Sequence, residues 1–162
     1  MNDDDLRHLR RAVDLAAEAV GAGDEPFGSV LVDGRGTVRR EDRNRVGSGD
    51  GTLHPELVLA QWAAAHLAPE ERADATVYTS GEHCPMCAAA HAWAGLRRIV
   101  YATSAAQLTT WRDELGLPAS PVRPLPIRDV APGLIVEGPA PELADEVRAL
   151  HRRYATGSVD AG

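Results

Sequence analysis

Two kinds of segment alternate along the chain: short apolar runs rich in β-branched residues, and longer stretches with apolar side chains at helical spacing. The short runs predict strands at 27–32, 37–44, 76–79, 98–102 and 134–136. The longer stretches predict helices at 3–22, 55–67, 84–94, 105–115 and 141–154. Strands that alternate with helices favour an α/β fold, so we expect a three-layer α/β/α sandwich with helices on both faces of a mixed sheet.

The segments between these elements differ in character. The expected strand at 37–44 carries a charged run from Arg39 to Arg43, which indicates that one of its faces is in water or that it lies at a sheet edge. Pro69 and the charged residues after it interrupt the helical pattern, and five prolines between 118 and 132 indicate a long surface connection. A chain of 162 residues fits one domain, which we expect to span 1–154, with a frayed tail at 155–162.

Charge and cysteine content exclude several classes of protein. The net charge is −7 at pH 7 and the sequence pI is about 5.3, which argues against non-specific binding to nucleic acid or to an anionic membrane. No apolar run approaches the roughly 18 residues of a membrane span. The acidic residues at the start of the chain are unlike a signal peptide. Cys84 and Cys87 form a single Cys-x-x-Cys, so we expect a cytoplasmic protein whose thiols share one task.

Two fragments, each at the start of an expected helix, carry the chain's chemistry: His54-Pro55-Glu56, and Cys-Pro-Met-Cys at 84–87. Cysteines three apart share one helical face, and zinc accepts an imidazole beside two thiolates. Three protein ligands leave a fourth position for water, which is the layout of a catalytic zinc site. Two thiolates cancel the charge of zinc and weaken its effect on that water, so a nearby base is needed. Glu56 is placed to be that base.

Simpler interpretations of the same residues remain open. The Cys-x-x-Cys can be a dithiol redox pair. It can also belong to a closed structural zinc site, because His91 follows Cys87 by four residues and could complete a tetrahedron with His54 or His83. Glu56 can be an acidic residue that only stabilises the first turn of its helix.

The two fragments together resemble the signature of zinc nucleobase deaminases, H-x-E followed by P-C-x-x-C. On these residues, and over roughly 6–101, the chain resembles the cytidine deaminase superfamily; residues 25–30 and 78–80 are similar to its bacterial guanine deaminase branch. The resemblance implies a five-stranded mixed sheet between helices. It also implies zinc held by His54, Cys84 and Cys87, with Glu56 as the proton shuttle of a hydrolytic deamination that releases ammonia.

Two residues depart from the pattern of the family that the chain resembles. Pro55 stands where the family usually has Ala between its His and Glu, so any contact made by that backbone N–H is lost. His83 stands where the family usually has Pro before the first Cys. The His83 imidazole either touches the substrate or only occupies the loop. Both departures bear on the identity of the substrate more than on the type of reaction.

The resemblance also implies substrate contacts. Asn44 is expected to hydrogen-bond the base or ribose, or else to be a turn residue, and Phe27 to pack near the substrate ring or in the core. Trp93 is either a core residue or a stacking surface. Tyr154 resembles a C-terminal aromatic residue that closes a pocket, sometimes that of a neighbouring subunit.

The expected substrate is an aminated nucleobase or nucleoside, either a guanine-like purine or a related amino-azaheterocycle such as cytosine or a triazine. Asp113 falls roughly where guanine deaminases carry a carboxylate that reads the amidine edge of the purine, and Glu114 competes for this role.

Two alternative functions and an assembly state accompany this expectation. A tRNA adenosine deaminase shares the motifs, but the net charge of −7 argues against RNA. A non-catalytic zinc-stabilised module is the alternative from another class. Relatives are usually dimers or larger, so a homodimer is expected.

Overall fold

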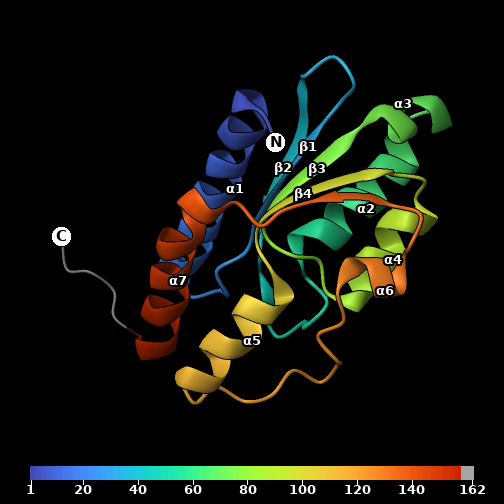
Figure 1. Cartoon of the computed structure of the whole chain (residues 1–162). Coiled ribbons are helices and arrows are strands. Elements are labelled where there is room, and N and C mark those ends of the chain that lie inside the picture. The colour runs from blue at the N-terminus through green and yellow to red at the C-terminus, as the bar shows by residue number, and fades with distance from the viewer. Residues whose placement is uncertain (158–162) are drawn as a thin grey trace.

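The computed structural model describes residues 1–157 and contains a five-stranded sheet with helices on both faces (Figure 1). The strands lie in the order β2-β1-β3-β4-β5. Their bounds are Gly28–Val32 for β1, Val38–Arg43 for β2, Thr76–Gly81 for β3, Arg98–Thr103 for β4 and Ile135–Glu137 for β5. β1 is antiparallel to β2 and β3, whereas β3, β4 and β5 run parallel. The predicted α/β fold with a mixed sheet is confirmed.

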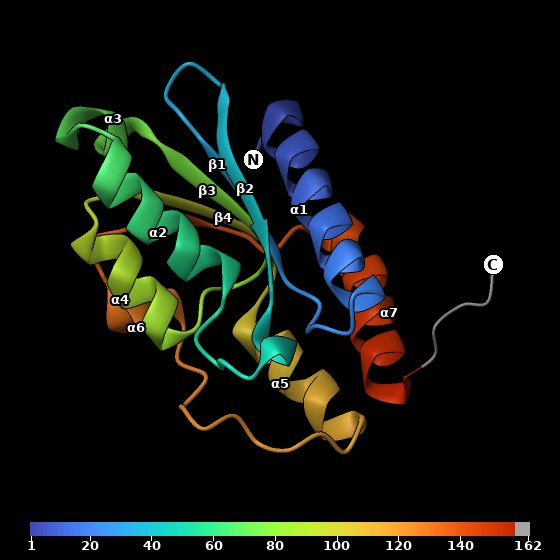
Figure 2. The same cartoon turned by 180° about the vertical axis from the view of Figure 1, so that it is seen from behind.

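Two long helices, α1 (Asp3–Gly21) and α7 (Pro141–Thr156), lie side by side on one face of the sheet (Figures 1 and 2). α1 begins with a capping box, in which Asn2 and Asp5 each accept the other's backbone N–H. A Cβ on Gly28 would lie 2.3 Å from the Ala12 carbonyl oxygen, so glycine is what lets β1 approach α1 this closely. The buried aliphatic side chains of both helices form the larger core cluster against the sheet.

The opposite face of the sheet is covered by α2 (Pro55–His66), α4 (Pro85–Trp93) and the short α6 (Ile127–Val130). α2 and α4 pack against each other, and each has proline at its first helical position, where the missing N–H costs nothing. α5 (Ala105–Glu114) follows β4 and is capped by Ser104. A 3-10 turn, η1 (Val46–Ser48), lies in the loop before α2.

The structure departs from the sequence-based expectations in three segments. Residues 69–74, expected to be irregular, form α3 (Pro69–Asp74), because Pro69 starts the turn and Glu71 accepts the backbone N–H of Ala68. α6 lies inside the proline-rich connection, and its first N–H is accepted by a side chain distant in sequence, that of Glu82. Both helices are too short to produce a periodic pattern.

The third departure is at the C-terminal end. α7 continues to Thr156 and ends at Gly157, whose φ of +64° suits glycine, so fraying does not begin at residue 155. Residues 158–162 of the expected tail lie outside the described residues.

β2 is at a sheet edge, as its charged run predicts. Within the described part of the chain, no helix has the length and apolar character that crossing a bilayer requires.

Candidate metal centre and active site

Two helix starts carry the predicted ligands. His54 is the N-cap residue of α2 and Cys84 is the N-cap residue of α4, in line with the helix starts expected from the sequence. Because α2 and α4 pack side by side, their N-terminal ends meet above the sheet (Figure 2). Cys87 lies one turn further along α4 and is buried. Both helix dipoles therefore direct their positive ends at the same small volume.

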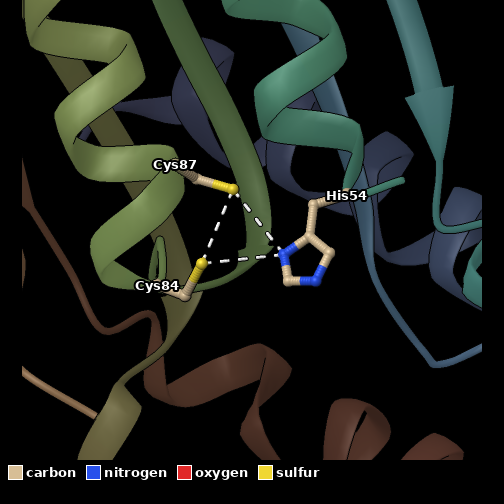
Figure 3. Close-up of side chains that lie close together, drawn as sticks. All are labelled: His54, Cys84 and Cys87. Atoms are coloured by element: carbon tan, nitrogen blue, oxygen red, sulfur yellow. Dashed lines mark hydrogen bonds between the residues drawn. The ribbon is translucent and has the colours of Figure 1, made fainter. Parts of the chain in front are cut away.

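The three candidate ligand atoms form a nearly equilateral triangle (Figure 3). His54 Nδ1 lies 3.6 Å from each cysteine Sγ, and the two sulfurs are 3.6 Å apart. Tetrahedral zinc with Zn–S near 2.3 Å and Zn–N near 2.0 Å requires ligand-to-ligand separations of about 3.5–3.8 Å. The donor set and its spacing therefore fit one zinc ion. Among the described residues, only these three side chains form such a group, so the closed four-ligand site with His91 or His83 is not present here.

The thiols and the imidazole perturb one another's protonation. The pKa of Cys84 is lowered to about 4 by its hydrogen bonds with Cys87 and with His54, which outweigh burial. The pKa of Cys87 is raised by its hydrogen bond with Cys84 and by burial. The pKa of His54 is raised by its bond to Cys84 and by the charges of Glu56 and Glu25, against the effect of burial. Without a metal ion, the arrangement thus favours one thiolate, that of Cys84, beside a protonated His54, while Cys87 keeps its proton.

Glu56, in the first turn of α2, is only 5% exposed. Burial raises the pKa of its carboxyl, although the charge of His54 opposes the shift. The Thr79 hydroxyl donates to Glu56 Oε1 at 2.9 Å, and the Ser29 hydroxyl lies 3.3 Å from that oxygen and 2.9 Å from Thr79 Oγ1. The carboxylate is therefore held from β1 and β3. Sequence reasoning gave Ser29 and Thr79 no role, although a hydroxyl in an otherwise apolar buried strand is the signal that could have identified them.

Asn44 follows β2 and is completely buried. The side-chain Oδ1 of Asn44 accepts the backbone N–H of Val46 at 3.0 Å, and the backbone N–H of Asn44 donates to the Phe27 carbonyl at 2.9 Å. Its Nδ2, by contrast, has no hydrogen-bond partner among the described residues. Because Oδ1 is engaged, the side chain offers a donor to whatever occupies the neighbouring space.

Phe27 lies between the sheet and the C-terminal helix. Its ring is in contact with Gly81, where an added Cβ would lie 3.0 Å from the ring, and it meets the His151 ring edge-to-face at a centroid distance of 5.3 Å. The Trp111 ring lies at a centroid distance of 5.8 Å from that of His151. Tyr154 is half-buried and packs against the larger core cluster, to which Trp111 belongs. His151, which sequence reasoning did not select, is thus the α7 residue in contact with Phe27.

Three other predicted residues are exposed at the C-terminal ends of their helices. Trp93 is 91% exposed at the C-terminal end of α4, the end opposite Cys84, so its interpretation as a core residue is wrong. Asp113 is exposed near the end of α5, and Glu114 is also exposed and pairs with Arg148 of α7. Their short local pattern could not show which way the last turn of α5 faces.

His83 lies in the interior of the protein. It is 1% exposed, and its ring meets that of His91 at a centroid distance of 5.4 Å. Of the two sequence-based interpretations of this residue, the arrangement favours the one in which it occupies the loop.

Comparison with known proteins places this geometry in a family. Residues 2–103, more than half of the chain, match the model described as the cytidine and deoxycytidylate deaminase zinc-binding region. The chain belongs to this family. It is a hydrolytic deaminase, its cofactor is zinc, and its His54, Cys84 and Cys87 form the group that fits the ion.

Individual relatives point to the same chemistry. The chain is 32% identical over 162 residues to a probable cytosine deaminase of Schizosaccharomyces pombe, covering 97% of this chain and 96% of the relative. It is 39% identical over 95 residues to a guanine deaminase of Bacillus subtilis, covering 58% and 61% of the two chains. A solved guanine deaminase of Nitrosomonas europaea is similar with a TM-score of 0.70 and 25% identity, over 92% of this chain and 83% of that one. The predicted membership of the guanine deaminase-like branch is confirmed.

Proposed function

We propose that this deaminase acts on a free aminated nucleobase, either a guanine-like purine or a related heterocycle such as cytosine. The observation that carries the proposal is a buried carboxylate, Glu56, two residues from one corner of the His54–Cys84–Cys87 triangle. Relatives named for guanine and for cytosine both align with the chain, and the latter aligns over nearly its full length. The net charge of −7 disfavours a polyanionic substrate such as tRNA.

His54, Cys84 and Cys87 would hold the zinc ion. When bound, the ion makes a water molecule reactive towards the amino-bearing carbon of the substrate ring. The remaining chemistry is proton transfer. A C–O bond forms, the C–N bond breaks, and the protons of water are delivered to the ring nitrogen and then to the departing amine, which leaves as ammonia.

Glu56 is the group proposed to carry these protons. A carboxyl whose pKa is raised by burial both accepts and releases a proton closer to neutral pH than an exposed one does. The hydroxyls of Thr79 and Ser29 keep the carboxylate in one orientation during both transfers. Exclusion of water from the space around Glu56 strengthens its electrostatic interactions with the reacting atoms.

Asn44 and Phe27 are proposed to orient the base. The unpartnered Nδ2 of Asn44 is a donor, so it suits a ring nitrogen or a carbonyl oxygen of the substrate. The half-buried Phe27 ring, backed by His151 and Gly81, offers an apolar edge for a planar heterocycle. Asp113, Glu114, Tyr154, Trp93 and His83 receive no substrate contact within a single chain in this proposal.

A substrate panel tests the proposal. Guanine, cytosine, adenine, their nucleosides, aminotriazines and a tRNA anticodon stem-loop are incubated with the zinc-loaded protein, and ammonia release is measured. We expect release from at least one free base and a loss of that release in Glu56→Gln. Deamination of the stem-loop without any free base would overturn the proposed substrate class. Absence of release from every compound would favour the non-catalytic module.

We also propose that the protein is a homodimer that associates through the outer face of α2 and α4. Apart from the buried Glu56, neither helix contains Asp, Glu, Lys or Arg, and Trp93 projects from the end of α4. A helix pair without exposed charge is typical of a surface that another chain covers. Trp93→Glu should shift the protein from dimer to monomer in light scattering, because a large aromatic is a common interface anchor.

The control for this test is Val38→Glu, which alters an exposed apolar side chain on β2 and should leave the mass unchanged. A monomeric parent protein, or a Trp93→Glu variant as dimeric as the parent, would contradict this interface.

A further inference from the structure

Two histidines outside the ligand triangle are sealed in the interior. His83 is 1% exposed and His91 is 0% exposed, and their rings meet at 85° with centroids 5.4 Å apart. None of their four ring nitrogens has a hydrogen-bond partner among the described residues. The metal centre does not use them as ligands, and burial favours their neutral forms by lowering the pKa of each ring.

Four unpartnered nitrogens in one place need an explanation. A neutral imidazole has one donor and one acceptor, and leaving these groups without partners inside a protein costs free energy. The two rings lie edge to face and make no direct hydrogen bond with each other. Buried polar groups of this kind are commonly bridged by an ordered water molecule, which can supply both a donor and an acceptor.

The two residues lie at both ends of the segment that presents the sulfurs. His83 immediately precedes Cys84 in the loop before α4. His91 follows Cys87 by four residues, which puts His91 and Cys87 on one face of α4. On the other side of His83, the Glu82 carboxylate accepts the first N–H groups of α5 and α6, from Ala105 at 2.8 Å and Ile127 at 2.9 Å. The loop that delivers Cys84 is thus anchored at Glu82, and His83 is buried next to that anchor.

We propose that His83 and His91, joined through a buried water molecule, are positioning residues that hold the loop before α4 in the register that both thiolates need. His83 occupies the place where the family usually has proline, so the device belongs to this chain rather than to the family pattern. The proposal rests on the zinc site proposed above. It predicts that the pair acts as a unit. Removal of one ring leaves the other without its hydrogen-bonding partner, whereas apolar replacement of both rings removes the polar groups that need partners.

The test measures zinc release to an excess of chelator for His83→Leu, His91→Leu and the double variant. Each single variant should release zinc about tenfold faster than the parent, an effect of the size found when supporting residues of a metal site are removed. The double variant should recover most of the difference. His66→Leu, which alters an exposed ring stacked on Trp62, and Val147→Ala, a core truncation on the far face of the sheet, are the controls. Val147→Ala should lower the melting temperature without changing zinc release.

Nitrogen-15 NMR of the unaltered zinc-loaded protein gives an independent readout. The His83 ring N–H should be protected from solvent exchange, and its resonance should shift in His91→Leu. Additive effects of the two single substitutions, or ring N–H groups that exchange with solvent as fast as those of a free imidazole, would overturn the proposal. A parent protein that binds no zinc would instead sink the proposed metal site.

Discussion

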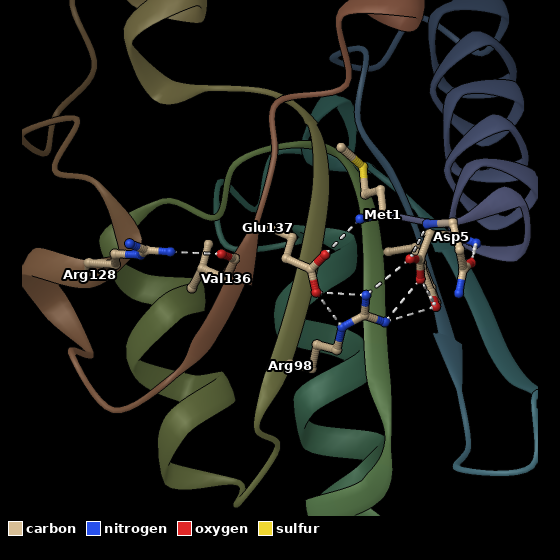
Figure 4. Close-up of polar contacts among 8 residues, drawn as sticks. Met1, Asp5, Arg98, Arg128, Val136 and Glu137 are labelled. Atoms are coloured by element: carbon tan, nitrogen blue, oxygen red, sulfur yellow. Dashed lines mark hydrogen bonds and ion pairs between the residues drawn. The ribbon is translucent and has the colours of Figure 1, made fainter.

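The two faces of the sheet differ in how completely their buried polar groups are hydrogen-bonded. On the α1–α7 face, Asp5 is 3% exposed and is fully engaged: it accepts from both Nη atoms of Arg98, at 2.9 and 3.1 Å, and from the Tyr78 hydroxyl at 2.8 Å (Figure 4). Arg98 also binds Glu137 of β5. This network joins α1 to three strands and leaves little hydrogen-bonding capacity unused.

On the α2–α4 face and at its rim, fewer of the buried polar groups have hydrogen-bond partners. This face and its rim contain the ligand triangle, the buried carboxylate of Glu56, the free amide nitrogen of Asn44 and the unpartnered rings of His83 and His91. Unmet polar capacity costs stability, so it persists where a metal ion, a water molecule or a substrate completes it. The difference indicates that stability is concentrated on the first face and chemistry on the second.

Glu56→Gln is expected to separate catalysis from stability most strongly. The variant should lose about 10³-fold in turnover, within the range of general acid–base catalysis, because an amide cannot carry the proton. It should keep one zinc per chain and melt no lower than the parent, since a buried carboxylate is replaced by a neutral group of the same shape. Ammonia release, metal analysis and thermal unfolding measure the three quantities. A variant that turns over at near the parent rate removes Glu56 from the proposed mechanism.

The next largest effect concerns the metal. Cys87→Ala should lose stoichiometric zinc, and with it ammonia release, because two remaining ligands hold the ion poorly. The Asp5 network lies on the far face, so far-ultraviolet circular dichroism should still report the parent content of helix and strand. Full zinc retention in this variant would mean that other side chains bind the ion.

Arg98→Met is expected to have the opposite effect, a loss of stability without a loss of turnover. Removing this guanidinium leaves the buried Asp5 carboxylate without its cationic partner, which should cost about 3 kcal/mol in the free energy of unfolding. Denaturant titration measures this loss. Turnover per folded molecule should be unchanged, because the residue lies on the face away from Glu56. A large change in the substrate KM would show that the two faces are coupled.

A smaller effect follows from the pKa of Asp5. Burial alone would raise it, but hydrogen bonds from Arg98, the Asn2 backbone and Tyr78 lower it to about 2. A carboxyl with a lowered folded-state pKa stabilises the fold above its unfolded pKa of roughly 3.9 and loses that contribution as the pH falls towards 2. About 2 kcal/mol should therefore disappear between pH 5 and pH 2. In Asp5→Asn the loss of stability over this pH range should be smaller by about this amount, and an unchanged slope would contradict the assignment.

The same contrast explains what the sequence could predict. Local signals located the elements and the ligands: helical periodicity predicted α1 and α7, and the ligands were predicted from the Cys-x-x-Cys spacing and the resemblance to the deaminase signature. Contacts between distant residues were beyond it. The Glu82 anchor of α6, the Thr79 and Ser29 bonds to Glu56 and the His83–His91 pair each join residues from different elements. The interpretation of Trp93 as a core residue is wrong for a related reason, because composition does not say which way a terminal helical turn faces.

X-ray absorption at the zinc edge of the purified parent protein tests the central claim most directly, that His54, Cys84 and Cys87 hold one ion and leave a position open beside Glu56. The account predicts two sulfur ligands at about 2.3 Å, one imidazole at about 2.0 Å and one further light-atom ligand that is not imidazole. Two imidazoles in the coordination shell, or an absence of zinc–sulfur scattering, would contradict it.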